Sequence, residues 1–139
     1  MQWSAMEINP EMLNKVLAQL EVSDAWKFVD VLGYEDESLN NVPTPGCAIL
    51  LLFPITPQHE NFRKCQIKEL QEKNANNKVY FLKQTIGTSL GTVGLIHAVA
   101  NNKDKLNFAE NSVLKGFIEQ TAALSPEERA KHLEKKMRL

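Results

Sequence analysis

The sequence of 139 residues predicts an α+β domain that is rich in helix. Several stretches place apolar residues at helical spacing directly after a capping residue, whereas two shorter stretches have the alternating or continuous apolar character of strands. With 43% hydrophobic residues, a chain of this length can bury a core. No repeat, low-complexity tract or linker divides it, so residues 1–139 are expected to form a single domain.

The first expected helix is recognised by its start. The Asn9 side chain can cap free backbone N–H groups, and Pro10 fits the first helical position, where no N–H is needed. Apolar residues then recur at helical spacing and predict one buried face. This face consists of Leu13, Val16, Leu17 and Leu20.

A second helix is expected over residues 56–73. Thr56 is its cap and Pro57 its first residue, which repeats the pattern at Asn9 and Pro10. Most of its other residues are polar or charged. Phe62 and Leu70 are therefore expected on its inner side, facing the core.

Three further helices are expected in the second half of the chain. An apolar helix begins at Leu90, a second helix occupies residues 111–124, and a third occupies residues 125–137. The last begins with a full capping box, in which Ser125 is followed three residues later by Glu128.

Strands are expected in three places. Residues 26–32 alternate between apolar and polar side chains, and residues 78–84 are short and β-prone. Residues 47–53 form a continuous apolar run closed by Pro54, which is typical of a central strand buried on both faces. Only two of these strands are clear, and two strands seldom make an independently stable sheet, so the sheet is expected to be incomplete in this chain.

Composition excludes several classes of function. Lys and Arg number 16 against 17 Asp and Glu, a balance that favours neither nucleic acid nor an anionic membrane as partner. The longest apolar run is too short to span a bilayer, and the N-terminus does not resemble a signal peptide. Two isolated cysteines and three scattered histidines predict neither a disulfide framework nor a metal site, and no cofactor motif is present. A cytoplasmic protein without metal or cofactor is expected.

Residues 84–102 attract attention as a possible catalytic elbow. Glycines at positions 87, 91 and 94 surround the start of the apolar helix and would allow close approach to the backbone. A thiol at the start of such a helix would be activated by the local field. The residue at that position is Leu90, which has no ionisable group.

This elbow resembles the catalytic segment of the ubiquitin C-terminal hydrolases, a family of cysteine proteases. The segment is "FLKQTIGTSLGTVGLIHAVANN", residues 81–102. Further segments resemble the family in the same order: "MEINPEMLNKVL", "FVDVLG", "CAILLLFPIT", "HENFRK", "NNKDKL" and "SPEERAKHLE". The resemblance implies a papain-like fold with a central antiparallel sheet. It also implies a family activity, thiol-dependent hydrolysis of bonds at the C-terminal glycine of ubiquitin.

The resemblance assigns roles to particular positions. Gln84 matches the glutamine that stabilises the oxyanion, and Leu90 matches the nucleophilic cysteine. Met6, Glu7, Ile8, Asn9 and Pro10 match part of the surface that contacts ubiquitin. The family's general-base histidine and its aspartate fall beyond residue 139, and the final "KKMRL" is unlike the family's continuation. A truncated and catalytically inactive homologue is therefore expected, with ubiquitin as a weakly bound partner.

Other residues could in principle replace the missing nucleophile or base. Ser89 adjoins Leu90 but points about 100° away on a helix, so a capping role is favoured. Cys47 reads as a core residue, and Cys65 lies mid-helix with nothing near it in sequence to activate it. His97 shares a helix face with Leu90 but lies roughly 10 Å along the axis, so a structural role is favoured over that of a base.

Two roles are considered for Ser125. It precedes a proline and two glutamates and is a possible phosphorylation site, but its role as a helix cap already accounts for it.

Three functional hypotheses remain open. The chain could be a thiol deubiquitinase by ancestry alone, a pseudoenzyme that binds ubiquitin or another protein without cleavage, or a splice or gene-model fragment without a stable fold. Ubiquitin binding separates the second hypothesis from the third.

Overall fold

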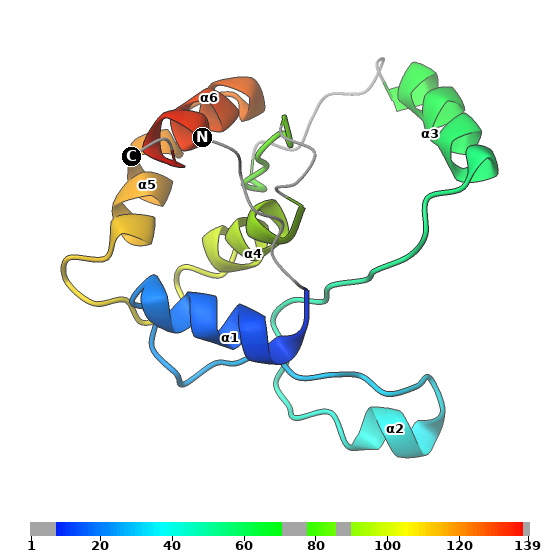
Figure 1. The fold of residues 1–139 in the computed structure, drawn as a ribbon, viewed down its shortest axis with the longest axis horizontal. Coiled ribbons are helices and arrows are strands. Elements are labelled where there is room, and N and C mark those ends of the chain that lie inside the picture. The colour runs from blue at the N-terminus through cyan, green and yellow to red at the C-terminus, as the bar shows by residue number, and fades with distance from the viewer. Residues whose placement is uncertain (1–7, 71–77, 86–89, 138–139) are drawn as a thin grey trace. The chain divides into compact units, whose positions relative to one another are not determined.

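The computed structural model describes residues 8–70, 78–85 and 90–137. They fall into two compact parts, one made of the chain up to residue 48 together with the chain from residue 80 onward, and a smaller one made of residues 49–79. Figure 1 shows the helices of both parts. In the described residues these are α1 (Pro10–Gln19), α2 (Asp36–Asn40), α3 (Pro57–Leu70), α4 (Leu90–Ala100), α5 (Val113–Thr121) and α6 (Pro126–Met137).

The expected helix starts are confirmed. The Asn9 side chain accepts a hydrogen bond from the Met12 N–H at 2.8 Å and so caps α1. The Thr56 hydroxyl accepts one from the His59 N–H at 3.2 Å at the start of α3. At the start of α6, the Glu128 N–H donates to the Ser125 hydroxyl at 3.2 Å, and the Ser125 N–H donates to the Glu128 carboxylate at 3.1 Å. This reciprocal pair is the capping box that the sequence predicts.

The end of α1 is closed by a backbone turn. Glu21 follows the helix with φ of 62°, in the left-handed region that glycine usually occupies. Its N–H donates to the Ala18 carbonyl at 3.1 Å, and the Val22 N–H donates to the Leu17 carbonyl at 3.0 Å. The two bonds satisfy carbonyl groups that the helix end leaves free, and they carry Val22 into the core.

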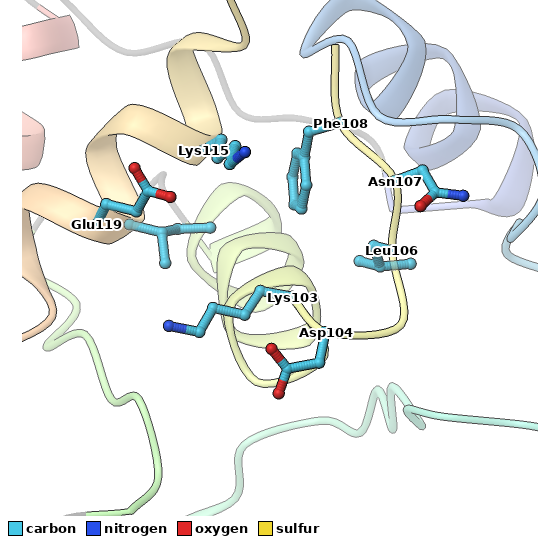
Figure 2. Close-up of a pocket in the computed structure, with 8 residues that line it drawn as sticks. Lys103, Asp104, Leu106, Asn107, Phe108, Lys115 and Glu119 are labelled. Atoms are coloured by element: carbon cyan, nitrogen blue, oxygen red, sulfur yellow. The ribbon is translucent and has the colours of Figure 1, made fainter. Parts of the chain in front are cut away.

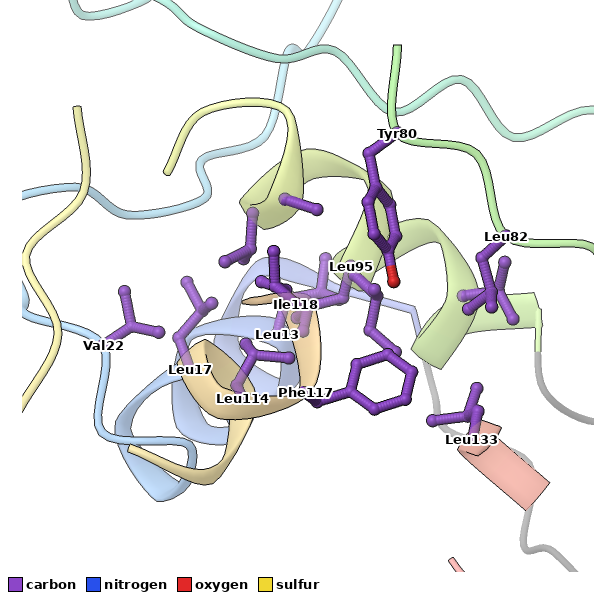
Figure 3. Packing of buried hydrophobic residues seen from close by; sticks show 14 of the residues in the cluster. Leu13, Leu17, Val22, Tyr80, Leu82, Leu95, Leu114, Phe117, Ile118 and Leu133 are labelled. Carbon is purple, nitrogen blue, oxygen red and sulfur yellow. The ribbon is translucent and has the colours of Figure 1, made fainter. Parts of the chain in front are cut away.

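The core of the larger part is built around α4. This helix is apolar on all sides, so it is stable only when other elements surround it. Figure 3 shows side chains of α1 and α5 gathered with Leu95 of α4. The buried hydrophobic residues are Leu13, Leu17, Val22, Tyr80, Leu82, Val93, Leu95, Ile96, Val99, Ala100, Leu114, Phe117, Ile118, Ala130 and Leu133.

The three expected strands are absent from the residues that the structure describes. Residues 26–32, 47–53 and 78–84 have no strand structure. The β-pairing among the described residues is one isolated antiparallel bridge between Val22 and Phe108. A strand forms only where a neighbouring backbone supplies the complementary N–H and C=O groups. The helix-rich character of the chain is confirmed, but the strand prediction is wrong for these segments.

Side-chain amides occupy backbone groups that a neighbouring strand would have used. The Asn14 side chain accepts from the Phe28 N–H at 2.7 Å and donates to the Phe28 carbonyl at 3.0 Å. Asn101 makes the same pair of bonds with Tyr80, at 2.7 Å and 3.0 Å. Each amide thus binds one residue as an adjacent strand would, which satisfies the backbone without building a sheet.

The smaller part differs most from the sequence prediction. The run from Ile49 to Ile55 is exposed rather than buried on both faces, with Ile49 92% exposed. On α3, Phe62 and Leu70 are also exposed, so their expected inner position is wrong. The physical reason is size, because a segment this short cannot enclose a core of its own.

Candidate functional site

Leu90 occupies the position at which the family resemblance predicts a nucleophile. It is the first residue of α4 and is 55% exposed, whereas the next residue, Gly91, is buried. An exposed side chain at a helix start is accessible to a partner and lies close to free backbone N–H groups. A leucine side chain there can make apolar contacts but has neither a lone pair nor an acidic proton.

Gln84 belongs to an extended segment, residues 80–85, that side chains hold from two directions. On one side, His97 of α4 and Asn101, which directly follows α4, bind the backbone of Leu82 and Tyr80. On the other side, the Arg129 guanidinium of α6 donates to the Phe81 carbonyl at 2.9 Å. The segment therefore has a defined position relative to α4.

The segment is also attached to α6 on either side of Gln84. The Lys83 N–H donates to the Pro126 carbonyl at 3.4 Å, and the Thr85 hydroxyl donates to the Glu134 carboxylate. Gln84 itself is exposed and has an interaction partner.

His97 is a structural histidine, as the sequence reading favours. Its Nε2 atom lies 2.9 Å from the Leu82 nitrogen and 3.1 Å from the Leu82 oxygen. Its ring stacks on Phe81 with centroids 5.2 Å apart. Burial lowers the pKa of His97 below its usual value of 6.5, against the opposing effect of the hydrogen bond with the Leu82 backbone. This side chain is therefore neutral at pH 7 and engaged with Leu82.

Arg129 and Tyr80 form a polar group inside the core. The guanidinium lies 4.1 Å from the centre of the Tyr80 ring, and the Tyr80 hydroxyl lies 2.7 Å from the Thr121 hydroxyl. Burial raises the pKa of Tyr80 above its usual value of 10.0, which outweighs the lowering caused by the Thr121 hydrogen bond and the Arg129 charge. Arg129 also donates to the Thr121 and Ala122 carbonyls at 2.8 Å and 2.7 Å, where α5 ends.

The N-terminal residues expected to contact ubiquitin have structural roles where the structure describes them. Ile8 is partly buried against the core, Asn9 caps α1, and Pro10 is the first residue of that helix. Met6 and Glu7 lie outside the described residues. Ser89, the candidate replacement nucleophile, also lies outside them.

The two cysteines lie in different parts of the chain. Cys47 is half-buried and belongs to the larger part, whereas Cys65 is exposed on α3 of the smaller part. The half-buried position of Cys47 is less protected than the core position that the sequence reading favours.

Neither metal nor membrane features are evident in the described ranges. No three His, Cys, Asp or Glu side chains gather there as a metal ion would require. No helix among those residues combines the length and the apolar character needed to cross a bilayer.

A cavity of about 430 Å³ opens beside α5 (Figure 2). Its lining combines apolar side chains with charges of both signs, and no cysteine, serine, threonine or histidine lines it. We therefore assign it no catalytic chemistry. The lining residues are Lys103, Asp104, Leu106, Asn107, Phe108, Lys115, Ile118 and Glu119.

Sequence reasoning did not identify Asn101 and Arg129 as organising residues. Asn101 lies at the polar end of an apolar helix, where a turn is the simplest reading. Arg129 lies in a charged helix and resembles a solvated residue, although it is only 8% exposed. Arg129 lies one turn after Ser125 and on the same side of α6 as Leu133, and this position could have indicated that it faces the core.

A comparison with known protein families identifies the family of this chain. The family model described as "Ubiquitin carboxyl-terminal hydrolase, family 1" matches residues 3–139. The chain therefore belongs to the ubiquitin carboxyl-terminal hydrolase family, which confirms the resemblance seen in its sequence.

Individual relatives are named ubiquitin carboxyl-terminal hydrolase isozyme L1. The protein of Monodelphis domestica is 67% identical over 135 residues, and that of Homo sapiens is 65% identical over the same length. Each alignment covers 97% of this chain and 60% of the relative. The chain thus spans about 60% of the length of these relatives.

Proposed function

We propose that this chain binds ubiquitin without hydrolysing bonds to it. The observation that supports the absence of hydrolysis is Leu90 at the first position of α4, the position that the resemblance matches to the nucleophilic cysteine of the family. Hydrolysis by a cysteine protease requires a thiolate, and leucine cannot supply one. Loss of the nucleophile from a comparable triad lowers turnover on the order of a million-fold.

The described residues offer no clear replacement for this nucleophile. His97 engages the Leu82 backbone and lies two helical turns from Leu90, roughly 10 Å along the axis. Cys65 is exposed on α3 in the other part of the chain, and Cys47 precedes the exposed run at Ile49. None of these side chains is paired with a base in the described structure.

Binding is supported by the exposed features around the same helix. Leu90 is accessible, and Gln84 lies on a segment held by both α4 and α6. We expect an affinity for ubiquitin no tighter than high micromolar. Ile8, Asn9 and Pro10 serve the fold, so fewer residues are left to offset the entropic cost of association.

A second candidate is a chain without an independently stable fold. The exposed apolar run Ile49–Ile55 supports it, since natural proteins usually pair or cover such segments.

The test uses the full chain with a single thiol placed at position 90. Cys47→Ser and Cys65→Ser together remove the native thiols, and Leu90→Cys is added to this background. Leu90→Ser in the same background is the matched control, because it is small and polar but supplies no thiolate. Each protein is incubated with a ubiquitin whose C-terminus carries an electrophile, with or without excess free ubiquitin, and with a fluorogenic ubiquitin C-terminal amide.

We expect the unmodified chain to release no fluorophore above the blank. The Leu90→Cys protein should be labelled slowly at position 90, labelling should fall when free ubiquitin competes, and the Leu90→Ser control should remain unlabelled. Release of fluorophore by the unmodified chain would refute the non-catalytic assignment. Labelling that free ubiquitin does not reduce would refute ubiquitin binding at this site.

A further inference from the structure

One nitrogen of His97 lies within hydrogen-bond distance of two groups on the same residue. The Leu82 N–H and the Leu82 carbonyl are 2.9 Å and 3.1 Å from His97 Nε2. Leu82 is fully buried, so water does not replace either partner.

The two hydrogen bonds cannot exist together. Without a proton, Nε2 has a lone pair and accepts from the Leu82 N–H. With a proton, Nε2 donates to the Leu82 carbonyl, and the buried Leu82 N–H loses its acceptor. A buried N–H without a partner is costlier and rarer than a carbonyl with an unused lone pair, so the accepting form is favoured while His97 is neutral.

Tyr80 and Gln84, two residues before and after Leu82, are expected to respond differently when His97 is protonated. Tyr80 is held by the amide of Asn101, which does not titrate. Gln84 lies two residues after Leu82, on the side where the Lys83 N–H makes a long bond of 3.4 Å to Pro126. Between Leu82 and Gln84 the backbone has this one long bond, and the Thr85 bond to Glu134 lies beyond Gln84, so a change at Leu82 reaches Gln84 before it meets that second attachment. Toward Tyr80 it meets two shorter bonds to Asn101.

The surroundings of His97 determine how its protonation, and with it the hydrogen bond to Leu82, changes with pH. α4 carries no titratable residue besides His97, the segment bound to it carries Tyr80 and Lys83, and α6 contacts that segment through Arg129 and Glu134. The other charged or titratable residues of α1, α5 and α6 are Glu11, Lys15, Lys115, Glu119, Glu127, Glu128, Lys131, His132, Lys135 and Lys136. None of these groups sets the pKa of His97, which burial lowers and the Leu82 hydrogen bond raises. Protonation therefore occurs below pH 6.5 and is opposed by burial.

We propose that His97 is a positioning residue for Gln84. Protonation of its Nε2 atom reverses the hydrogen bond with Leu82 and so moves the segment that carries Gln84. The functional consequence, weaker contact between Gln84 and ubiquitin in acid, rests on the function proposed above. The exchange itself involves only this chain and is tested without ubiquitin.

The same change has a consequence for folding. The pKa of His97 is lower in the folded chain than in the unfolded chain, so the unfolded state binds the proton first as the pH falls. The contribution of neutral His97 to stability is thus complete above pH 6.5. It declines as the pH falls below 6.5, and the decline ends once the folded state is protonated as well.

The experiment is a pH titration of the ¹⁵N-labelled full chain by NMR, from pH 7.5 to pH 5. The ring nitrogens of His97 report its tautomer, and backbone amides report the segment. We expect Nε2 to be unprotonated at pH 7.5, and the Leu82 and Gln84 amides to shift with the same midpoint as His97. The Tyr80 amide is the internal control and should not follow that midpoint.

The matched variant is His97→Gln, whose side-chain amide can accept and donate without titrating. It should retain a hydrogen-bonded Leu82 amide and abolish the pH-dependent shifts of Leu82 and Gln84. The inference is overturned by a protonated Nε2 at pH 7.5, or by Leu82 and Gln84 amides that move no more than that of Tyr80. The wild-type titration decides this even if the variant does not fold, and failure of ubiquitin to bind leaves its result unchanged.

Discussion

Replacement of Arg129 by lysine tests whether one buried guanidinium joins three segments of the larger part. Its Nε, Nη1 and Nη2 atoms donate to the carbonyls of Thr121, Phe81 and Ala122 at 2.8 Å, 2.9 Å and 2.7 Å. Two of these carbonyls lie at the end of α5, where a helix leaves its last C=O groups free and carries partial negative charge. The third belongs to the segment that leads to Gln84.

The expected loss can be worked out from these contacts. A lysine ammonium is a single point charge and can reach one of the three carbonyls well, so about two charge-assisted hydrogen bonds are lost, at roughly 1.5–3 kcal/mol each. The Tyr80 ring, 4.1 Å from the guanidinium, loses a further contribution of about 1 kcal/mol. Since lysine retains some of these interactions, we expect Arg129→Lys to lower the free energy of unfolding by about 3–5 kcal/mol.

Urea unfolding followed by circular dichroism measures this loss. Arg63→Lys is the matched control, because Arg63 is exposed on α3 and makes a single ion pair with Glu60 at 3.2 Å. Such a surface pair contributes no more than about 0.5 kcal/mol, so the control should unfold like the wild type. A loss below about 1 kcal/mol for Arg129→Lys, or equal losses for both variants, would refute the assigned role of Arg129.

Two further predictions concern stability and association. Glu21→Gly relieves the left-handed backbone after α1 and should raise the free energy of unfolding by about 0.5–1 kcal/mol in the same urea assay, whereas Glu21→Ala should give no gain. Leu51→Lys places a charge in the exposed run Ile49–Ile55 and should reduce self-association in sedimentation velocity runs. Val113→Lys changes a similarly exposed residue outside that run, so an equal effect of both lysines would contradict the role of the run.

The most reliable sequence predictions were local. Asn9, Thr56 and Ser125 each begin a helix because a short polar side chain binds an N–H group three residues later. These bonds depend on neighbours along the chain, so the residues themselves specify them. Family membership was equally accessible, because residues 81–102 and six other segments resemble the family in order.

The candidate site was predictable only in part. The sequence places Leu90 at the start of an apolar helix, and the structure agrees. It could not indicate that Arg129 reaches Phe81, 48 residues earlier, or that His97 binds the backbone of Leu82. Such contacts depend on which segments meet in space, and no spacing along the chain encodes them.

By itself, the sequence determined the helix starts, the apolar helix at Leu90 and the family. Only the tertiary structure decided which extended segments gain partners. An apolar run such as residues 47–53 has the composition of a strand, but β-structure requires a second backbone at the correct distance and register. In the other two segments, the hydrogen-bonding partners come from side chains instead. Asn14 binds the backbone of Phe28, and Asn101 binds the backbone of Tyr80. The helices form within their own segments, whereas the extended segments depend on what lies beside them.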